Sequence, residues 1–538
     1  MKKTIQKLMA ALLAVAMVCA MAIPAFAYNP GETEEDLNTK HDYGAFQIFT
    51  GDVSEDNKTI SNVRWGKNIT EPDIFLAELK ADSTIGHLFN GATAVQDVLA
   101  VISTWNDSDD NSIAFARVVC KYLYPTAGAK PEPVDTGHTG GFEIRKPGYY
   151  LIVDTSSFSD GDSYHAYNSF LLKVNKANYH VQITPKVVKP YVEKEVYDNQ
   201  DGTSNGAGFG PSADHAINEP FQFKLTATLP ASKDNGRAYD YYDKYTVTFH
   251  DTLSEGITFD HWDTVVINNG GSDITIPPEK YTYDVSDQNL TLSIDNVKTC
   301  APELNLNDGA TITVTYTAHL NENAYVNTAT NGDTKNTNKV YLTYSNNPRI
   351  NTSVGQTPES EVYVFTYQLN NTKYRDEVNE NNKLAGAGFR LYSDIACNEE
   401  QEIKLKQNED GTYSRDFSTE GKGVEMKSAE DGTFNVKGLD AGTYYLKETS
   451  TPTGFNTCPV TTVVIKANHT GNNVDLTGST INGEGVGASG LSTTIVNKQG
   501  TTLPSTGGMG TTLFYVIGGG LMVAAIVLLV TKKRMENK

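Results

Sequence analysis

The carboxy-terminal end of the chain constrains its architecture more than any other stretch. Residues 513–530 are a run of eighteen residues without a charge, and Lys532, Lys533 and Arg534 follow closely. As an α-helix rising ~1.5 Å per residue, this run nearly crosses a hydrocarbon core of ~30 Å. Basic residues stay on the cytoplasmic side of a membrane, so we expect everything before Leu513 to lie outside the cell.

The motif LPSTG, at residues 503–507, precedes this apolar run. The order of motif, apolar span and basic tail resembles the sorting signal of Gram-positive surface proteins. The resemblance implies that a sortase cysteine attacks the carbonyl of Thr506, releases Gly507 with all that follows, and passes the acyl group to an amine. We therefore assign residues 500–538 to a sorting signal with a transient membrane helix and a basic tail.

The amino-terminal end has the features of a secretory signal peptide. Lys2 and Lys3 precede an apolar run, and residues 25–27 read Ala-Phe-Ala, which is an A-x-A cleavage site. The sequence predicts a signal peptide over residues 1–27 and a sorted product of residues 28–506. At ~150 residues per domain, that product has room for about three domains.

The composition fits an acidic protein of the cell surface. A net charge of −21 and a pI near 4.9 argue against nucleic-acid binding, because phosphates are bound by basic patches. Exported chains meet oxidising conditions, so we expect a disulfide between Cys397 and Cys458, which fall in one predicted domain. Cys120 and Cys300 are expected to be buried free thiols.

Apolar and polar residues alternate along most of the chain, with Gly, Asn and Asp between the alternating stretches, which is typical of β-strands. We predict an all-β fold of tandem immunoglobulin-like (Cna-like) β-sandwich domains in an elongated rod. The first domain is more mixed, because residues 72–79 and 94–102 have helical spacing, while residues 148–153 read as a strand. Changes in composition near prolines divide the sorted product into domains over residues 28–185, 186–348 and 349–499.

A lysine of the third domain falls on the apolar face of its predicted strand. Steps of two along residues 363–369 select apolar residues, and the same period aims Lys373 at the core. The same count in two other strands aims Glu448 and Asn497 inward. Burying an amine, a carboxyl group or a carboxamide without a partner is costly. We therefore expect these three residues, the third-domain triad, to meet.

Two segments near this triad carry a family resemblance. Residues 445–455, YLKETSTPTGF, resemble the E-box of Gram-positive pilins, and residues 384–392, LAGAGFRLY, resemble the early strands of Cna-B-like domains. In that family such a triad makes an intramolecular isopeptide bond. Burial lowers the lysine pKa so that a neutral amine attacks, and raises the carboxylic acid pKa so that its proton polarises the asparagine carbonyl. The competing interpretation is a buried salt bridge between Lys373 and Glu448.

The middle domain repeats this arrangement with different residues. Lys194, Asp251 and Asn338, the middle-domain triad, each fall on the inward face of an alternating strand. Residues 249–259 resemble the fimbrial isopeptide-forming middle domain, in which an aspartate takes the role of the acid. Two other asparagines near the end of this domain remain alternatives to Asn338: Asn336 and Asn331.

The resemblance covers nearly the whole chain and is to backbone (major) pilins assembled by class C sortases. It implies a structural shaft subunit of a covalent pilus, without a cofactor or a metal and without enzyme activity. The implied partners are a class C sortase, identical subunits, minor pilins as possible additions, and cell-wall peptidoglycan joined by a housekeeping sortase. The first domain, in which no triad emerges, resembles the amino-terminal domain of the same pilins.

Residues 179–186, YHVQITPK, are similar to the pilin motif whose lysine accepts the acyl group of the next subunit. The resemblance makes Lys186 the expected acceptor, with Lys189, which also sits beside a proline, as the alternative. The histidines are scattered without metal-ligand spacing, so no metal site or catalytic constellation is expected. The main alternative function is a monomeric LPXTG wall-anchored adhesin on the same scaffold.

Overall fold

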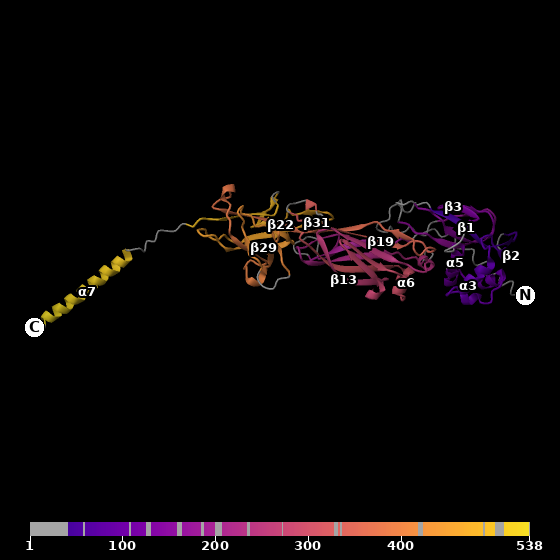
Figure 1. Ribbon diagram of the computed structural model, residues 1–538, viewed down its shortest axis with the longest axis horizontal. Coiled ribbons are helices and arrows are strands. Elements are labelled where there is room, and N and C mark those ends of the chain that lie inside the picture. The colour runs from indigo at the N-terminus through magenta and orange to yellow at the C-terminus, as the bar shows by residue number, and fades with distance from the viewer. Residues whose placement is uncertain are drawn as a thin grey trace.

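The computed structural model describes residues 41–56, 60–106, 109–124, 131–158, 164–183, 188–199, 207–233, 237–271, 273–327, 332–333, 336–417, 423–487, 490–500 and 510–536. Three folded parts follow one another along the longest axis, and helix α7 lies beyond the last of them (Figure 1). The prediction of an elongated, strand-rich chain of serial domains is confirmed.

The first domain combines a sheet with three α-helices. In the sheet, strands run in the order β2-β1-β5-β6, with β3 paired to β1, and a separate pair joins β4 to β7. The strands are β1 (Asp42–Val53), β2 (Ile60–Trp65), β3 (Asp135–His138), β4 (Phe142–Ile144), β5 (Gly148–Asp154), β6 (Ser169–Val174) and β7 (Tyr179–Val181). The helices are α3 (Pro72–Ala81), α4 (Val95–Ile102) and α5 (Asp110–Leu123), with the 3-10 turn η2 (Gly86–Phe89) between the first two.

The two helices expected in this domain are present, whereas α5 was not predicted. Proline opens α3, where its missing N–H costs nothing. Helix α5 buries nine of its residues, among them Phe115, which stacks on Phe49 of β1 with ring centroids 6.4 Å apart. Several of its buried residues are small, so the sequence does not show the clear separation of apolar and polar faces by which a surface helix is recognised.

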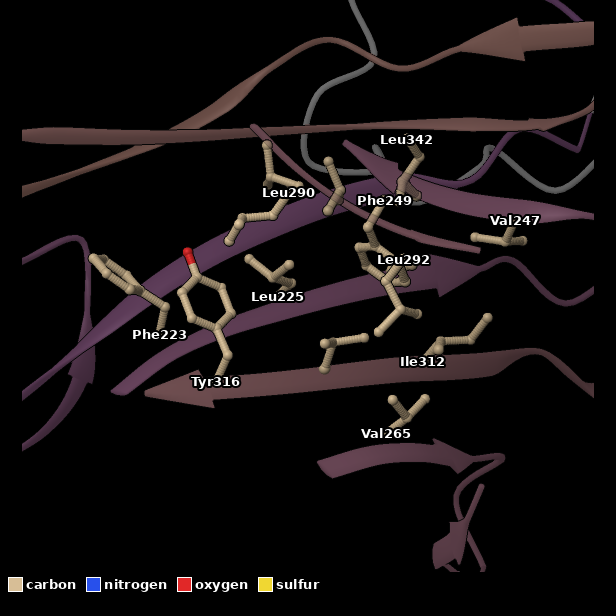
Figure 2. Packing of buried hydrophobic residues seen from close by; sticks show 14 of the residues in the cluster. Phe223, Leu225, Val247, Phe249, Val265, Leu290, Leu292, Ile312, Tyr316 and Leu342 are labelled. Carbon is tan, nitrogen blue, oxygen red and sulfur yellow. The ribbon is translucent and has the colours of Figure 1, made fainter. Parts of the chain in front are cut away.

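The middle domain is a sandwich of two sheets around one apolar core (Figure 2). One sheet has the order β14-β13-β17-β11-β8-β9, and the other β10-β21-β19-β12-β16-β15, with β20 paired to β19. The first sheet contains β8 (Tyr191–Asp198), β9 (Gly208–Gly210), β11 (Pro220–Leu229), β13 (Ile257–Asn268), β14 (Asp273–Thr275) and β17 (Ala310–Leu320). The second contains β10 (Ser212–Asp214), β12 (Val247–Leu253), β15 (Thr282–Ser286), β16 (Asn289–Ile294), β19 (Thr337–Ser345), β20 (Val354–Gln356) and β21 (Ser360–Phe365), and short turns are α6 (Val297–Cys300), η3 (Ala238–Tyr241), η4 (Pro278–Lys280) and η5 (Leu306–Asp308).

The middle domain extends further than the expected boundary at residue 348. Strands β20 and β21 both pair with β19, so this sheet continues to Phe365. The segment around Pro348 is a turn that packs on the first domain: Tyr167 donates its backbone N–H to the Asn346 carbonyl at 2.8 Å, and the Arg349 guanidinium lies 4.7 Å from the ring centre of Tyr124. Asn and Pro favour turns as well as linkers, and this turn was mistaken for a linker.

The third domain is a smaller sandwich that begins at β22. Its sheets have the orders β25-β26-β28-β22-β35 and β24-β23-β29-β30-β33-β34, with β27 paired to β23. The first sheet contains β22 (Tyr367–Arg375), β25 (Leu405–Gln407), β26 (Tyr413–Arg415), β28 (Val436–Leu439) and β35 (Ser492–Asn497). The second contains β23 (Gly388–Tyr392), β24 (Glu402–Ile403), β27 (Met426–Lys427), β29 (Gly442–Ser450), β30 (Thr461–Ile465), β33 (Thr480–Ile481) and β34 (Glu484–Gly485), and short turns are η6 (Glu380–Asn382) and η7 (Glu399–Gln401).

A small sheet of the order β18-β32-β31 crosses from the middle domain to the third domain. Its strands are β18 (Gly332–Asp333), β31 (Asn468–Thr470) and β32 (Asn473–Asp475). At the carboxy-terminal end, α7 (Gly510–Glu536) contains a segment, residues 514–536, that is long and apolar enough to cross a membrane. This helix coincides with the apolar run predicted to be the membrane span.

Candidate functional site

The third-domain triad meets in the core of its sandwich. Lys373 Nζ lies 2.5 Å from Asn497 Oδ1, and Asn497 Nδ2 donates a hydrogen bond to Glu448 Oε1 at 2.6 Å. The same Glu448 oxygen is 3.7 Å from Lys373 Nζ. One carboxylate oxygen therefore faces both the amine and the amide nitrogen, and the side chains of the lysine and the glutamate are fully shielded from solvent.

Strand pairing places these three side chains together. Lys373 on β22 and Asn497 on β35 belong to neighbouring parallel strands, whose register pairs Lys373 with Ile495 and Arg375 with Asn497. Glu448 reaches them from β29 in the opposite sheet. Burial alternates near the triad along all three strands, as predicted. The predicted period, counted from Tyr363, holds only from Tyr367 onward, since Tyr363 is half-buried while Val364 and Phe365 are both buried.

The surroundings of Lys373 favour its neutral form. Its removal from water lowers its pKa, and this effect outweighs the neighbouring Cys458 and Glu448, which act in the opposite direction. The amine also lies 5.2 Å from the ring centre of Phe389. The second oxygen of Glu448 accepts the backbone N–H of Cys458 at 2.8 Å, which fixes the orientation of the carboxylate.

In the middle domain, Lys194 crosses the core from one sheet to the acid on the other. Lys194 Nζ is hydrogen-bonded to Asp251 Oδ2, and both side chains are buried. Lys194 stands on β8, whereas Asp251 and Asn338 stand on the paired strands β12 and β19 of the opposite sheet. The Oδ1 atom of Asn338 is buried and has no hydrogen-bond partner.

A tyrosine that the sequence analysis missed connects the middle-domain triad. Tyr316 OH lies 3.3 Å from Lys194 Nζ and 3.3 Å from each oxygen of Asp251, and it accepts a hydrogen bond from Asn338 Nδ2. Its ring points from β17 into the core, with the hydroxyl toward the opposite sheet (Figure 2). Alternation along β17 gave a usable signal, because a tyrosine at an inward position needs a partner for its hydroxyl.

Burial also shifts the titration of the middle-domain triad. It lowers the pKa of Lys194 to about 8, against the opposing effect of Asp251, and it raises the pKa of Asp251. Both shifts increase the fraction of neutral amine and the fraction of protonated acid at physiological pH. The arrangement thus holds an amine of lowered basicity, an acid and an amide together in the buried core.

The alternative residues lie elsewhere or outside the described part of the chain. Asn336 is buried, and its carboxamide binds both backbone groups of Tyr325 at 2.8 Å. Lys189 is 6% exposed and donates to the Tyr164 carbonyl at 3.3 Å. Four predicted residues lie outside the described residues: Asn331, Lys186, Thr506 and Gly507.

The predicted disulfide between Cys397 and Cys458 is wrong, since both thiols are free in the structure. Cys397 lies near Lys447, whereas Cys458 lies near Glu448 and Lys373. Lys447 and Glu448 are consecutive residues of a strand, so their side chains point to opposite faces of the sheet. The two cysteines, each near one of these residues, therefore lie on different sides of the sheet. A shared domain and an oxidising compartment do not bring two thiols together.

Comparisons with known proteins match two segments in the carboxy-terminal third of the chain. Residues 368–480 match the SpaA family, a prealbumin-like fold domain, and residues 495–537 match the LPXTG cell wall anchor motif. No curated protein sequence matches the chain significantly. The SpaA match starts one residue after β22 begins, in agreement with the domain boundary seen in the structure.

Several solved structures are similar to the chain. A backbone pilin of Streptococcus pyogenes is 14% identical over 86% of this chain and 97% of its own, with a TM-score of 0.48. The pilus 2b backbone protein of group B streptococcus is 23% identical over 58% of this chain and 99% of its own, with a TM-score of 0.40. The major pilin SpaD of Corynebacterium diphtheriae is 18% identical over 69% and 85%, with a TM-score of 0.40.

The LPXTG motif and the apolar helix α7 place the protein at the cell wall, after a transient stage in the membrane. The SpaA domain lies directly before that anchor, at the end of a row of strand-rich domains. These findings identify the chain as a Gram-positive cell-wall-anchored protein that carries a SpaA prealbumin-like domain directly before its LPXTG anchor.

Proposed function

We propose that this protein is the shaft subunit of a covalent pilus, joined by a class C sortase and stabilised by two intramolecular isopeptide bonds. The observation that carries the proposal is the presence of two buried lysine triads in consecutive domains ahead of an LPXTG anchor. The role is structural, and the only chemistry assigned to the chain acts on itself.

In the third domain, the neutral Lys373 amine attacks the side-chain carbonyl carbon of Asn497. A bond forms between Lys373 Nζ and that carbon, the bond to Asn497 Nδ2 breaks, and ammonia leaves. Glu448 Oε1 lies between the amine and the leaving nitrogen, so it takes a proton from the first and gives it to the second. The close approach of amine and amide supplies the orientation that such a reaction needs.

In the middle domain, Lys194 attacks Asn338 by the same route, with Asp251 as the proton carrier. Tyr316 connects the acid, the amine and the leaving nitrogen through its hydroxyl. Asn338 Oδ1, which has no partner, is the atom on which negative charge develops. A protonated Asp251 is favoured by its raised pKa.

Between subunits, we propose that a sortase transfers the acyl group of Thr506 to Lys186 of the next subunit. The alternative acceptor, Lys189, is buried against Tyr164, which argues against its access to a sortase. A lysine amine outside a buried core is mostly protonated at neutral pH and does not react with an amide or acyl group unaided, so joining two subunits needs an enzyme. Identical subunits and cell-wall peptidoglycan are the remaining partners, with minor pilins as possible additions.

Two measurements test the proposal. The intact mass of residues 28–506 should fall short of the sequence mass by two ammonia molecules, one for each triad. In cells that carry the sortase, denaturing gels of wall extracts should show a ladder of covalent multimers. The mass loss without any ladder would instead support the monomeric adhesin.

The acceptor is tested by two matched substitutions. Lys186→Arg keeps the charge and should abolish the ladder, while single subunits still reach the wall. Lys189→Arg should leave the ladder intact. A ladder that survives the first change and disappears with the second would move the acceptor to Lys189.

A further inference from the structure

Three ionisable side chains from distant parts of the sequence meet where the middle domain joins the third domain. Asp198 ends β8, Asp214 ends β10, and His469 is the central residue of β31. Their facing nitrogen and oxygen atoms lie within 4.8 Å of one another, and all three residues are buried. The small sheet that crosses the junction holds β31 in this position, because β32 pairs with both β31 and β18.

The spacing of these atoms suits a shared metal ion. His469 Nε2 lies 3.1 Å from Asp198 Oδ2 and 3.7 Å from Asp214 Oδ1. Two ligand atoms that each bind a tetrahedral zinc ion at ~2.0–2.2 Å are separated by roughly 3.4 Å. The observed separations lie on either side of that value.

Asp214 provides an independent indication of a missing ligand. Its exposure is 0%, and neither of its carboxylate oxygens accepts a hydrogen bond of ordinary geometry, although the Tyr367 hydroxyl and the His469 imidazole lie close to it. Burying a carboxylate without hydrogen bonds is costly, and a cation would supply the interaction that these oxygens lack.

The other ring nitrogen of His469 is already occupied. His469 Nδ1 lies 2.8 Å from Ser212 Oγ, within hydrogen-bond distance. Metal-binding histidines commonly bind an oxygen through the nitrogen that does not face the metal, and this contact fixes the tautomer and the ring orientation. Ser212 therefore leaves Nε2 facing the two aspartates.

We propose that Asp198, Asp214 and His469 bind one divalent transition-metal ion, with zinc as the best match, and that this ion fastens the third domain to the middle domain. Zinc accepts imidazole nitrogen and carboxylate oxygen in a tetrahedral site, whereas calcium prefers six to eight oxygen ligands. Water completes the coordination. The three proposed ligands come from strands far apart in the sequence, so the spacing of histidines along the chain does not indicate them.

The test uses the full chain, purified in detergent and stripped of metal with EDTA. ZnCl2 is added, and binding is followed by native mass spectrometry and by the melting temperature. We expect one zinc per chain at one equivalent and a higher melting temperature, which EDTA reverses, while CaCl2 causes no shift. A chain that takes up no zinc at one equivalent, or whose melting temperature does not change, would overturn the proposal.

Matched variants separate this site from surface histidines. Asp214→Asn should lose the bound zinc, while Asp260→Asn, which removes the partner of the partly exposed His319, should keep it. Ser212→Ala leaves all three ligands in place and should weaken zinc binding by about 10- to 100-fold, since it removes the support of His469. Unchanged affinity in both Asp214→Asn and Ser212→Ala would contradict the site.

Discussion

The two triads hold the same three chemical groups in different ways. In the third domain, Lys373 and Asn497 stand on neighbouring strands and touch directly, with the acid reaching over from the opposite sheet. In the middle domain, the acid and the amide share a sheet, and Lys194 crosses the core to the acid. There, Tyr316 is the group that contacts all three members.

The two triads therefore differ in how a proton can pass from the amine to the leaving amide nitrogen. The third-domain triad needs no connecting group, because one oxygen of Glu448 faces both nitrogen atoms. The middle-domain triad relies on a hydroxyl to join the amide to the ion pair. We infer that the third-domain bond forms faster, and that the middle-domain bond is more sensitive to changes around its acid.

The largest expected effect comes from removing the acid of the third domain. Glu448→Ala should cancel one of the two ammonia losses and leave a buried amine without its acid. A covalent link that closes a loop between residues 124 positions apart contributes about 5 kcal/mol by the chain-entropy estimate, so the variant should melt earlier and be digested faster. Intact mass and limited proteolysis measure both effects.

The control for this change is Glu425→Ala. Glu425 accepts hydrogen bonds from Thr449 and Ser450, close to Glu448 in sequence, but does not contact the triad amine or amide. Its variant should keep both ammonia losses. If Glu448→Ala also kept both, the third-domain assignment would be wrong.

A smaller effect is expected from Tyr316→Phe, which tests the proposed role of the hydroxyl. Losing hydrogen bonds to charged groups costs ~1.5–3 kcal/mol, which corresponds to a roughly 10- to 100-fold slower middle-domain reaction. The third-domain bond should form at its usual rate. Mass spectra taken at intervals after cell-free synthesis follow the two losses separately.

Tyr245→Phe is the matched control, since Tyr245 is buried in the same core and its hydroxyl has no hydrogen-bond partner. Both bonds should form in it at the wild-type rate. Equal middle-domain rates in Tyr316→Phe and Tyr245→Phe would remove the tyrosine from the mechanism.

The smallest effect is a dependence of stability on pH in a chain whose middle-domain bond is blocked. In Asn338→Ala, Lys194 stays unlinked, with a folded-state pKa of about 8 against an ordinary 10.5. Between these values the unfolded chain binds more protons than the folded chain, so the free energy of unfolding should rise with pH from about 8 to about 10.5. Urea unfolding across this range measures the slope.

Adding Lys194→Met to the same variant removes the titrating amine and should flatten this slope. The corresponding blocked variant of the third domain, Asn497→Ala, also has a lysine whose pKa is lowered, so its stability should rise with pH in the same direction. A slope that persists without Lys194 would have to be assigned to another group.

How far the sequence predicts this molecule depends on whether the signal is local. Alternation along single strands was enough to predict that the side chains of the two triads point inward, and all six are buried. These positions stood out because burying an amine or a carboxamide is rare and costly. Which strands pair with each other, and which faces of the two sheets meet, could not be predicted from local alternation. Tyr316, the free Cys397 and Cys458, and the turn at Pro348 depend on which strands pair and which faces meet.

The parallel pairing of β22 with β35 determines how the third domain responds to pulling. These are the first and last strands of the domain, and because they run side by side in the same direction, the chain enters at one end of the pair and leaves at the other. Tension applied between the two ends of the domain would slide one strand along the other and strain all their hydrogen bonds at once. This geometry excludes opening the hydrogen bonds one by one, as in a zipper. A covalent bond between Lys373 and Asn497 would transmit the force directly from one strand to the other, so that the chain between these residues, which are 124 positions apart, would not bear it.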